Sequence, residues 1–144
     1  MDDEWREVEA EWQGGGTFIG RNAMGGTVQM GQLNERPGVS PMELILVGLG
    51  GCTGVDIADI LRKKRQPIYA LKVIVRGKKA LDFPKIYKEI EITYLIWGEG
   101  IDPIAVERAI QLSEEKYCSV SAMLRPVVDI RSTYQLLKPE SPIE

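Results

Sequence analysis

The chain has 144 residues, of which 44% are hydrophobic and 27% charged, and it contains no histidine. This length and balance are typical of one globular domain with a proper hydrophobic core. The net charge of -3 argues against nucleic acid or an anionic membrane as a partner. The missing histidine excludes Ser-His-Asp and Cys-His catalysis and histidine metal sites. The acidic first residues, "MDDEWREVEAEW", lack the apolar core of a secretory signal, so we expect a cytoplasmic location.

The first third of the chain predicts a three-stranded antiparallel meander. In "REVEAEW", Val8, Ala10 and Trp12 alternate with acidic residues, which is typical of a half-buried strand. The glycines of "QGGG" and "NAMGG" then predict turns before "TFIG" and "TVQMG".

A long helix is predicted over residues 41–65. Ser40 suits the N-cap, and Pro41 suits the first helical position. The first half of the helix, "MELILVGLGGC", is apolar nearly all round, which indicates burial on several sides. Its most apolar run, residues 44–55, is too short to cross a bilayer.

The rest of the chain predicts two strands, a helix and a last strand. "YALKVIVRG" and "IYKEIEITYLIW" alternate as strands joined by a hairpin-type connection. Asp102 and Pro103 begin a helix whose apolar stripe runs to Tyr117, and a short helical turn follows. Pro126 ends that turn, "VVDIRSTYQLL" is the last strand, and the tail "KPESPIE" should fray. The order predicts an α+β domain with helices covering a sheet.

Cys52 and Cys118 are the two cysteines, and each is either a packing residue or a redox-active thiol. Cys52 follows the glycines of "GLGGC", where close packing against a neighbouring element is one explanation. Asp56 lies one turn further along and disfavours a thiolate, so a reactive Cys52 would need an arginine from elsewhere. Cys118 follows Lys116 at a helix junction, where we expect a partly exposed, electropositive setting.

"SPMELILVGLGGCTGVDIADILRKKRQ" and "SEEKYCSVSAMLRP" together resemble the OsmC/Ohr superfamily, whose members include hydroperoxide reductases. The resemblance extends over residues 40–137. It implies one OsmC-like domain over residues 1–144, with antiparallel sheets wrapped around long central helices in an intertwined homodimer. The second chain would then cover the apolar helix, and Gly48, Gly50 and Gly51 would let the paired helices approach closely beside the thiol.

The resemblance also implies a reaction. Cys52 would attack an organic hydroperoxide and become a sulfenic acid, and Cys118 would resolve it to a disulfide. An external dithiol would reduce the disulfide, and no metal, haem or flavin would take part. The alternative is a non-enzymatic OsmC-like dimer that binds a small apolar ligand at the subunit interface.

Hydroperoxide reductases of the superfamily pair the reactive cysteine with an arginine and a glutamate. The glutamate follows the proline of an N-P-E motif, but Met42 stands there in this chain and the acid is Glu43. Glu43 either replaces that glutamate or is a favourable acid in the first helical turn. Arg36 is the favoured arginine and Arg21 the alternative, although either could be a solvated loop charge. Arg125 is expected at a helix end.

Overall fold

The computed structural model describes residues 5–140, 142 and 143. The acidic first four residues and part of the predicted fraying tail lie outside these described residues. The chain forms two compact units, Met1–Ile45 and Leu46–Glu144, and each is described by itself. A single domain over residues 1–144 stays a prediction.

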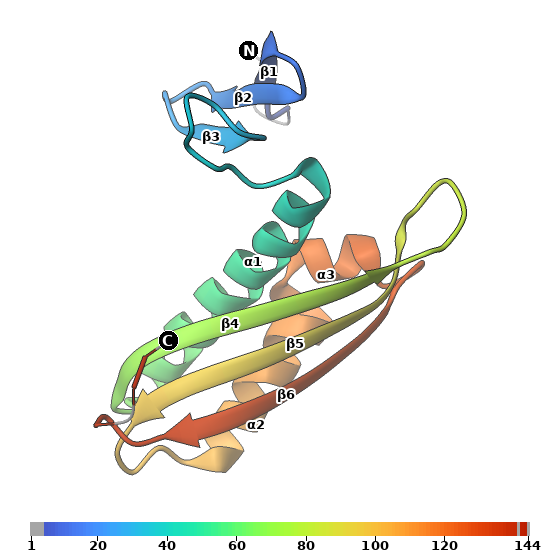
Figure 1. Cartoon of the computed structure of the whole chain (residues 1–144). Helices are drawn as coiled ribbons and strands as arrows, with labels where there is room; N and C mark the ends of the chain where they lie inside the picture. Colours follow the sequence, from blue (N-terminus) through green and yellow to red (C-terminus); the bar gives the residue numbers. More distant parts are fainter. Residues whose placement is uncertain (1–4, 141, 144) are drawn as a thin grey trace. The chain divides into compact units, whose positions relative to one another are not determined.

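The first unit contains the predicted meander. Strands β1 (Val8–Gly14), β2 (Thr17–Asn22) and β3 (Thr27–Met30) pair antiparallel in that order (Figure 1). The predicted half-burial of the first strand is not present within this unit, because Val8 is 74% and Trp12 65% exposed. The alternation is present, but within this unit no second layer packs on its apolar side.

Helix α1 (Pro41–Lys63) begins where the sequence predicts. The Glu43 N–H donates to Ser40 Oγ at 3.0 Å, and the Ser40 N–H donates to Glu43 Oε1 at 2.8 Å. This reciprocal pair is a capping box, which satisfies two backbone donors of the helix start. Arg65 has a φ of +58°, so regular helix ends before it.

The second unit is built on a three-stranded sheet of order β4-β5-β6. Strands β4 (Ile68–Lys79) and β5 (Tyr87–Gly98) form the predicted antiparallel hairpin, and β6 (Asp129–Leu137) pairs parallel to β5. The parallel pairing requires a crossover, which the intervening helices supply.

The crossover consists of α2 (Pro103–Leu112), the π-helical turn η1 (Ser113–Tyr117) and α3 (Ser119–Leu124). The predicted N-cap is confirmed, since the Ile104 N–H donates to Asp102 Oδ1 at 3.0 Å. The predicted stripe to Tyr117 is wrong at its end. The π turn changes the helical period after Leu112 and leaves Tyr117 exposed.

The core of this unit lies between the sheet and two helices. Figure 1 shows α1 and α2 behind the same face of the β4-β5-β6 sheet. The predicted inner face of β5 is confirmed, because Ile90, Ile92, Tyr94 and Ile96 are all fully or almost fully buried. On α1, Gly50 allows close packing, since a Cβ added there would lie 3.1 Å from Val75 Cγ2.

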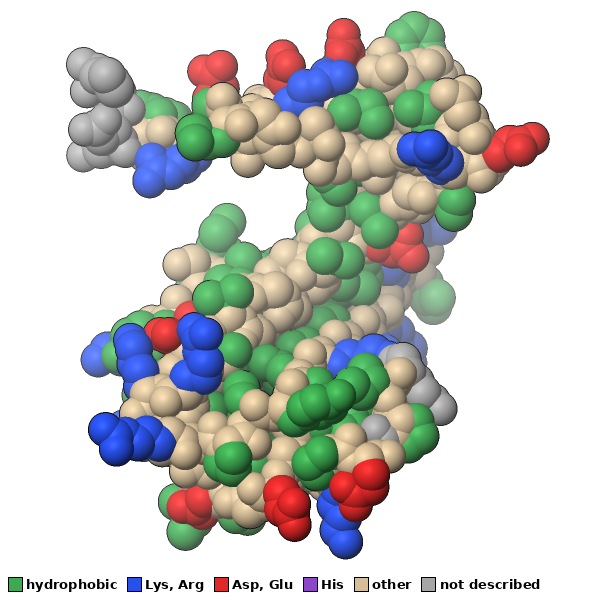
Figure 2. Space-filling view, turned by 90° about the vertical axis from the view of Figure 1, so that its left-hand side faces the viewer, with side chains coloured by type: hydrophobic (Ala, Val, Ile, Leu, Met, Phe, Trp, Pro, Cys, Tyr) green, Lys and Arg blue, Asp and Glu red, His purple; other side chains and the backbone are tan. Residues whose placement is uncertain are grey.

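The opposite face of α1 is apolar, and no described residue of the second unit covers it. Among the described helices, α1 is long and apolar enough by length and composition to span a membrane, but only 28% of its most apolar window is buried. Within the second unit α1 is therefore buried on one side only, and burial of its other side stays a prediction. Val55 is 70% exposed, and a Cβ added at Gly48 or Gly51 would meet no atom within 4 Å. Figure 2 shows hydrophobic side chains open to the surface between charged ones.

Candidate functional site

The fold brings the two cysteines near one another, since Cys52 acts on the pKa of Cys118. Cys52 lies on α1 and is partly exposed, whereas Cys118 lies between η1 and α3 and is only 3% exposed. Burial raises the pKa of the Cys118 thiol, and a hydrogen bond with Cys52 and the charge of Cys52 also raise it. Cys118 is therefore the thiol that holds its proton, and Cys52 is the more accessible of the two.

Cys118 is the N-cap of α3, and its surroundings correct the predicted partly exposed setting. Its extended backbone, with a φ of -78° and a ψ of 106°, follows the π turn, and its N–H donates to the Ser113 carbonyl at 2.7 Å. This bond holds the residue against η1, and the side chain is buried. The Ser121 N–H donates to Cys118 Sγ at 3.3 Å and, with the Ser121 hydroxyl, lowers the pKa of the thiol.

Asp56 links the helix that carries Cys52 to the segment before Cys118. Its carboxylate accepts a hydrogen bond from the Ser113 hydroxyl at 2.9 Å, and Ser113 is fully buried. Asp56, which the sequence places one helical turn after Cys52, therefore has Ser113 as a hydrogen-bond partner.

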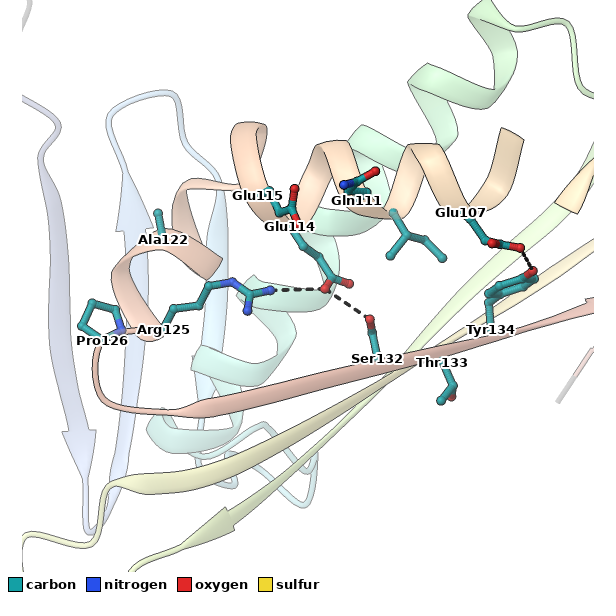
Figure 3. Close-up of a pocket in the computed structure, with 11 residues that line it drawn as sticks. Glu107, Gln111, Glu114, Glu115, Ala122, Arg125, Pro126, Ser132, Thr133 and Tyr134 are labelled. Atoms are coloured by element: carbon teal, nitrogen blue, oxygen red, sulfur yellow. Dashed lines mark hydrogen bonds and ion pairs between the residues drawn. The ribbon is translucent and has the colours of Figure 1, made fainter. Parts of the chain in front are cut away.

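A network of polar side chains, centred on the largely buried Glu114, lies near Cys118. Tyr94 donates to Glu114 Oε2 at 2.8 Å. Glu114 Oε1 accepts from Arg125 and Ser132, each at 3.2 Å (Figure 3). Burial, and then the Glu114 carboxylate, raise the pKa of Tyr94 far above its usual value, and the charge of Cys118 contributes to the same shift. Arg125 is at the end of α3 as predicted, and it also forms an ion pair with Glu114.

Sequence reasoning did not find Tyr94 or Glu114 as members of this site. The available signal was a tyrosine in a row of isoleucines on the inner face of β5, because a buried tyrosine hydroxyl needs a hydrogen-bond partner. Glu114 gave no signal, since an acid on a helix is usually solvated.

Two hollows lie near these residues. An apolar hollow of about 470 Å³ is lined by α1 and β4, and Gly51, which precedes Cys52, belongs to its wall. A polar hollow of about 850 Å³ between the crossover and β6 contains Glu114 and Arg125, together with Glu107, which accepts a hydrogen bond from Tyr134 at 2.7 Å (Figure 3). In the described part of the chain, no three Cys, Asp or Glu side chains cluster to hold a metal ion.

The other predicted site residues belong to the first unit. Arg21 forms an ion pair with Glu11 at 2.6 Å, and Glu43 is part of the capping box at Ser40. Arg36 is exposed, and its side chain has no ion pair within residues 5–140. Both thiols belong to the second unit, so their assembly with Arg36 and Glu43 stays a prediction.

Comparison with known proteins finds relatives over nearly the whole chain. A family model for OsmC-like proteins matches residues 32–133. Protein YhfA of Escherichia coli K12 is 33% identical over 131 residues, which are 91% of this chain and 98% of YhfA. A hypothetical protein from Aquifex aeolicus VF5 has a crystal structure that matches with a TM-score of 0.84 and 40% identity, over 94% of this chain and 98% of that one.

A more distant structure has the same fold. The organic hydroperoxide resistance protein OhrB of Bacillus subtilis matches with a TM-score of 0.62 and 18% identity, over 91% of this chain and 98% of that one. At this identity the similarity establishes the fold alone.

Proposed function

This chain belongs to the family of OsmC-like proteins, and we propose that it reduces organic hydroperoxides with Cys52 and Cys118. The observation that carries the proposal is that the fold brings these two thiols, which are far apart in the sequence, near enough for Cys52 to raise the pKa of Cys118. Proximity of two cysteines is the first requirement for a disulfide between them.

The reaction has two steps on the protein. The Cys52 thiolate attacks the distal oxygen of ROOH, the O–O bond breaks, and the alcohol leaves after taking a proton. Cys52 is then a sulfenic acid. The Cys118 sulfur attacks the Cys52 sulfur, the S–O bond breaks, and water leaves. An external dithiol reduces the disulfide and is itself oxidised to a disulfide.

The surroundings of the thiols support this division of roles. Cys118 is buried and its pKa is raised, so it keeps its proton while Cys52 reacts. Cys52 is partly exposed and follows Gly51 at the wall of the apolar hollow. That hollow suits the alkyl group of an organic hydroperoxide better than it suits hydrogen peroxide.

The active form that we propose is a homodimer. Gly48, Gly51 and Val55 follow each other at helical spacing on the uncovered face of α1, and Cys52 lies at the edge of the same face. A second copy that covers this face would enclose the thiols. Arg36 is the proposed partner of the Cys52 thiolate, from the same chain or the second one, and Glu43 would orient it.

Intact-mass measurement after one equivalent of cumene hydroperoxide tests the reaction. The wild-type protein should lose two hydrogen atoms as the disulfide forms, and Cys118→Ser should instead gain oxygen at Cys52. Cys52→Ser is the matched control and should do neither. Unchanged masses in all three proteins would reject the proposed peroxidase.

The second candidate is a non-enzymatic dimer that binds a small apolar ligand. The apolar hollow between α1 and β4 favours it, and this candidate predicts no disulfide after peroxide treatment. Binding of an environment-sensitive apolar dye, which cumene competes away equally in wild type and Cys52→Ser, would support this candidate if the masses stay unchanged.

A further inference from the structure

Ser121 lies on α3, three residues after Cys118, and carries a buried hydroxyl. Its side chain is fully buried, and within the described residues its Oγ has no hydrogen-bond partner. Buried hydroxyls are almost always paired, so an unpaired one in a native fold needs an explanation.

The backbone of Ser121 contacts the Cys118 sulfur. The Ser121 N–H donates to Cys118 Sγ at 3.3 Å, which places the backbone nitrogen of Ser121 against the thiol. The hydroxyl acts on the same sulfur, because it lowers the pKa of Cys118. Ser121 therefore donates its N–H to the buried sulfur and carries a hydroxyl, free among the described residues, that can become a second donor to it. Both groups stabilise the charged form of the thiol.

We propose that Ser121 activates Cys118 as the resolving thiol, donating from its N–H and its hydroxyl to the Cys118 sulfur as that sulfur attacks the sulfenic acid on Cys52. The inference rests on the proposed function. In the step, the S–S bond forms, the S–O bond of the sulfenic acid breaks, and the proton of Cys118 leaves with the hydroxide as water.

The same arrangement sets the order of the two steps. While Cys52 is a thiolate, its charge and its hydrogen bond hold the proton on Cys118. A sulfenic acid is neutral, so both effects are lost once Cys52 is oxidised. The N–H and hydroxyl of Ser121 then oppose the effect of burial on the Cys118 pKa, so the thiol loses its proton more easily. Cys118 therefore becomes reactive only after the peroxide has been consumed.

Ser121→Ala tests the proposal against Ser119→Ala as a matched control, since Ser119 is exposed on the same short helix. Each protein receives one equivalent of cumene hydroperoxide, is quenched at intervals by acid, and is analysed by intact mass. Loss of one hydrogen bond to the thiolate should slow conversion of sulfenic acid to disulfide about tenfold near pH 7, and the midpoint of its pH profile should rise about one unit. Ser119→Ala should match the wild type.

The outcomes separate the two proposals. If no protein forms sulfenic acid or disulfide, the proposed function fails and this inference falls with it. If sulfenic acid appears but Ser121→Ala resolves it at the wild-type rate and with the wild-type pH profile, the inference about Ser121 is wrong and the proposed function stands.

A second measurement does not depend on peroxide. In Cys52→Ser, Cys118 is the remaining thiol, and the ultraviolet absorbance of its thiolate can be titrated directly. Adding Ser121→Ala should raise the titration midpoint by about one pH unit, whereas adding Ser119→Ala should leave it unchanged. Ser121→Thr, which keeps the hydroxyl, should restore the midpoint in this background. An identical midpoint with and without the Ser121 hydroxyl would overturn the proposal.

Discussion

Tyr94 is the tyrosine in a row of isoleucines on the inner face of β5, and its hydroxyl donates to the Glu114 carboxylate, which is only 11% exposed. Tyr134 makes the same kind of bond to Glu107, but at the surface. The two pairs have the same chemistry and differ in burial, so together they measure what burial adds to a tyrosine–glutamate hydrogen bond.

Tyr94→Phe should destabilise the protein by about 1–3 kcal/mol, because the largely buried Glu114 carboxylate then loses a hydrogen-bond donor. Tyr134→Phe should change little, since water replaces the lost donor at an exposed site. Urea unfolding of both variants beside the wild type measures the difference. Equal losses in the free energy of unfolding would mean that burial adds nothing to the contribution of the Tyr94 hydrogen bond.

The Tyr94 pair also predicts a pH dependence. The pKa of Tyr94 is raised in the folded state, so the unfolded chain loses this proton first as the pH rises. The stability contribution is complete below the unfolded pKa of about 10 and declines above it by about 1.4 kcal/mol per pH unit. The free energy of unfolding should therefore fall more steeply above about pH 10 in the wild type than in Tyr94→Phe. Parallel curves from urea unfolding at each pH would contradict this.

Glu43 has two possible roles, and one substitution separates them. Glutamine can replace glutamate in a capping box but cannot hold an arginine by charge. Glu43→Gln should therefore keep the unfolding midpoint within experimental error and lose most of the peroxide-dependent disulfide formation. Ser40→Ala is the control, with a loss of about 1 kcal/mol in stability and its activity retained. Full activity in Glu43→Gln would make Glu43 a capping residue alone.

At the scale of elements, local signals were sufficient for the ends of helices and strands. Ser40, Pro41, Asp102 and Pro103 mark helix starts by their own chemistry, and the alternation in β5 identifies its buried face. The π turn was not predictable in this way. It depends on the fully buried Ser113, whose hydroxyl bonds to Asp56 from a distant helix.

The hydrogen bond between Ser113 and Asp56 should hold α1 against η1. Ser113→Ala leaves the partly buried Asp56 carboxylate without this donor, which should cost about 1–2 kcal/mol in the free energy of unfolding. Because Cys118 directly follows η1, loss of this hydrogen bond should also displace Cys118 and slow disulfide formation. Urea unfolding and the mass time course measure the two effects, with Ser119→Ala as the control. A Ser113→Ala variant that resolves sulfenic acid as fast as the wild type would show that this bond does not position Cys118.

The candidate site was only partly predictable for the same reason. Cys52 and Cys118 could be named because cysteine chemistry is restricted to few residues. The carboxylate and hydroxyls around them could not, because Glu114, Ser121 and Ser113 are polar residues whose burial is decided by packing between distant segments. The sequence gives no signal for that burial.

At the scale of the whole molecule, each unit leaves open an apolar face that the sequence predicts to be buried. Val8 and Trp12 on β1 and Val55 on α1 are each at least 65% exposed. Large exposed apolar faces mark interaction surfaces. The resemblance to intertwined dimers names a second copy of this chain as the partner that we propose.

Val55→Glu should convert the proposed dimer to a monomer, because it places a charge in the centre of the uncovered α1 face. Ile104→Glu is the matched control, since Ile104 is 75% exposed on α2, a different helix, and should leave the dimer intact. Sedimentation equilibrium measures the mass of each protein, and circular dichroism checks that both variants fold. If the active site needs the second chain, Val55→Glu should also lose peroxide-dependent disulfide formation while Ile104→Glu keeps it. A wild-type protein that sediments as a monomer, or a Val55→Glu variant that remains a dimer, would show that this face of α1 does not form the interface.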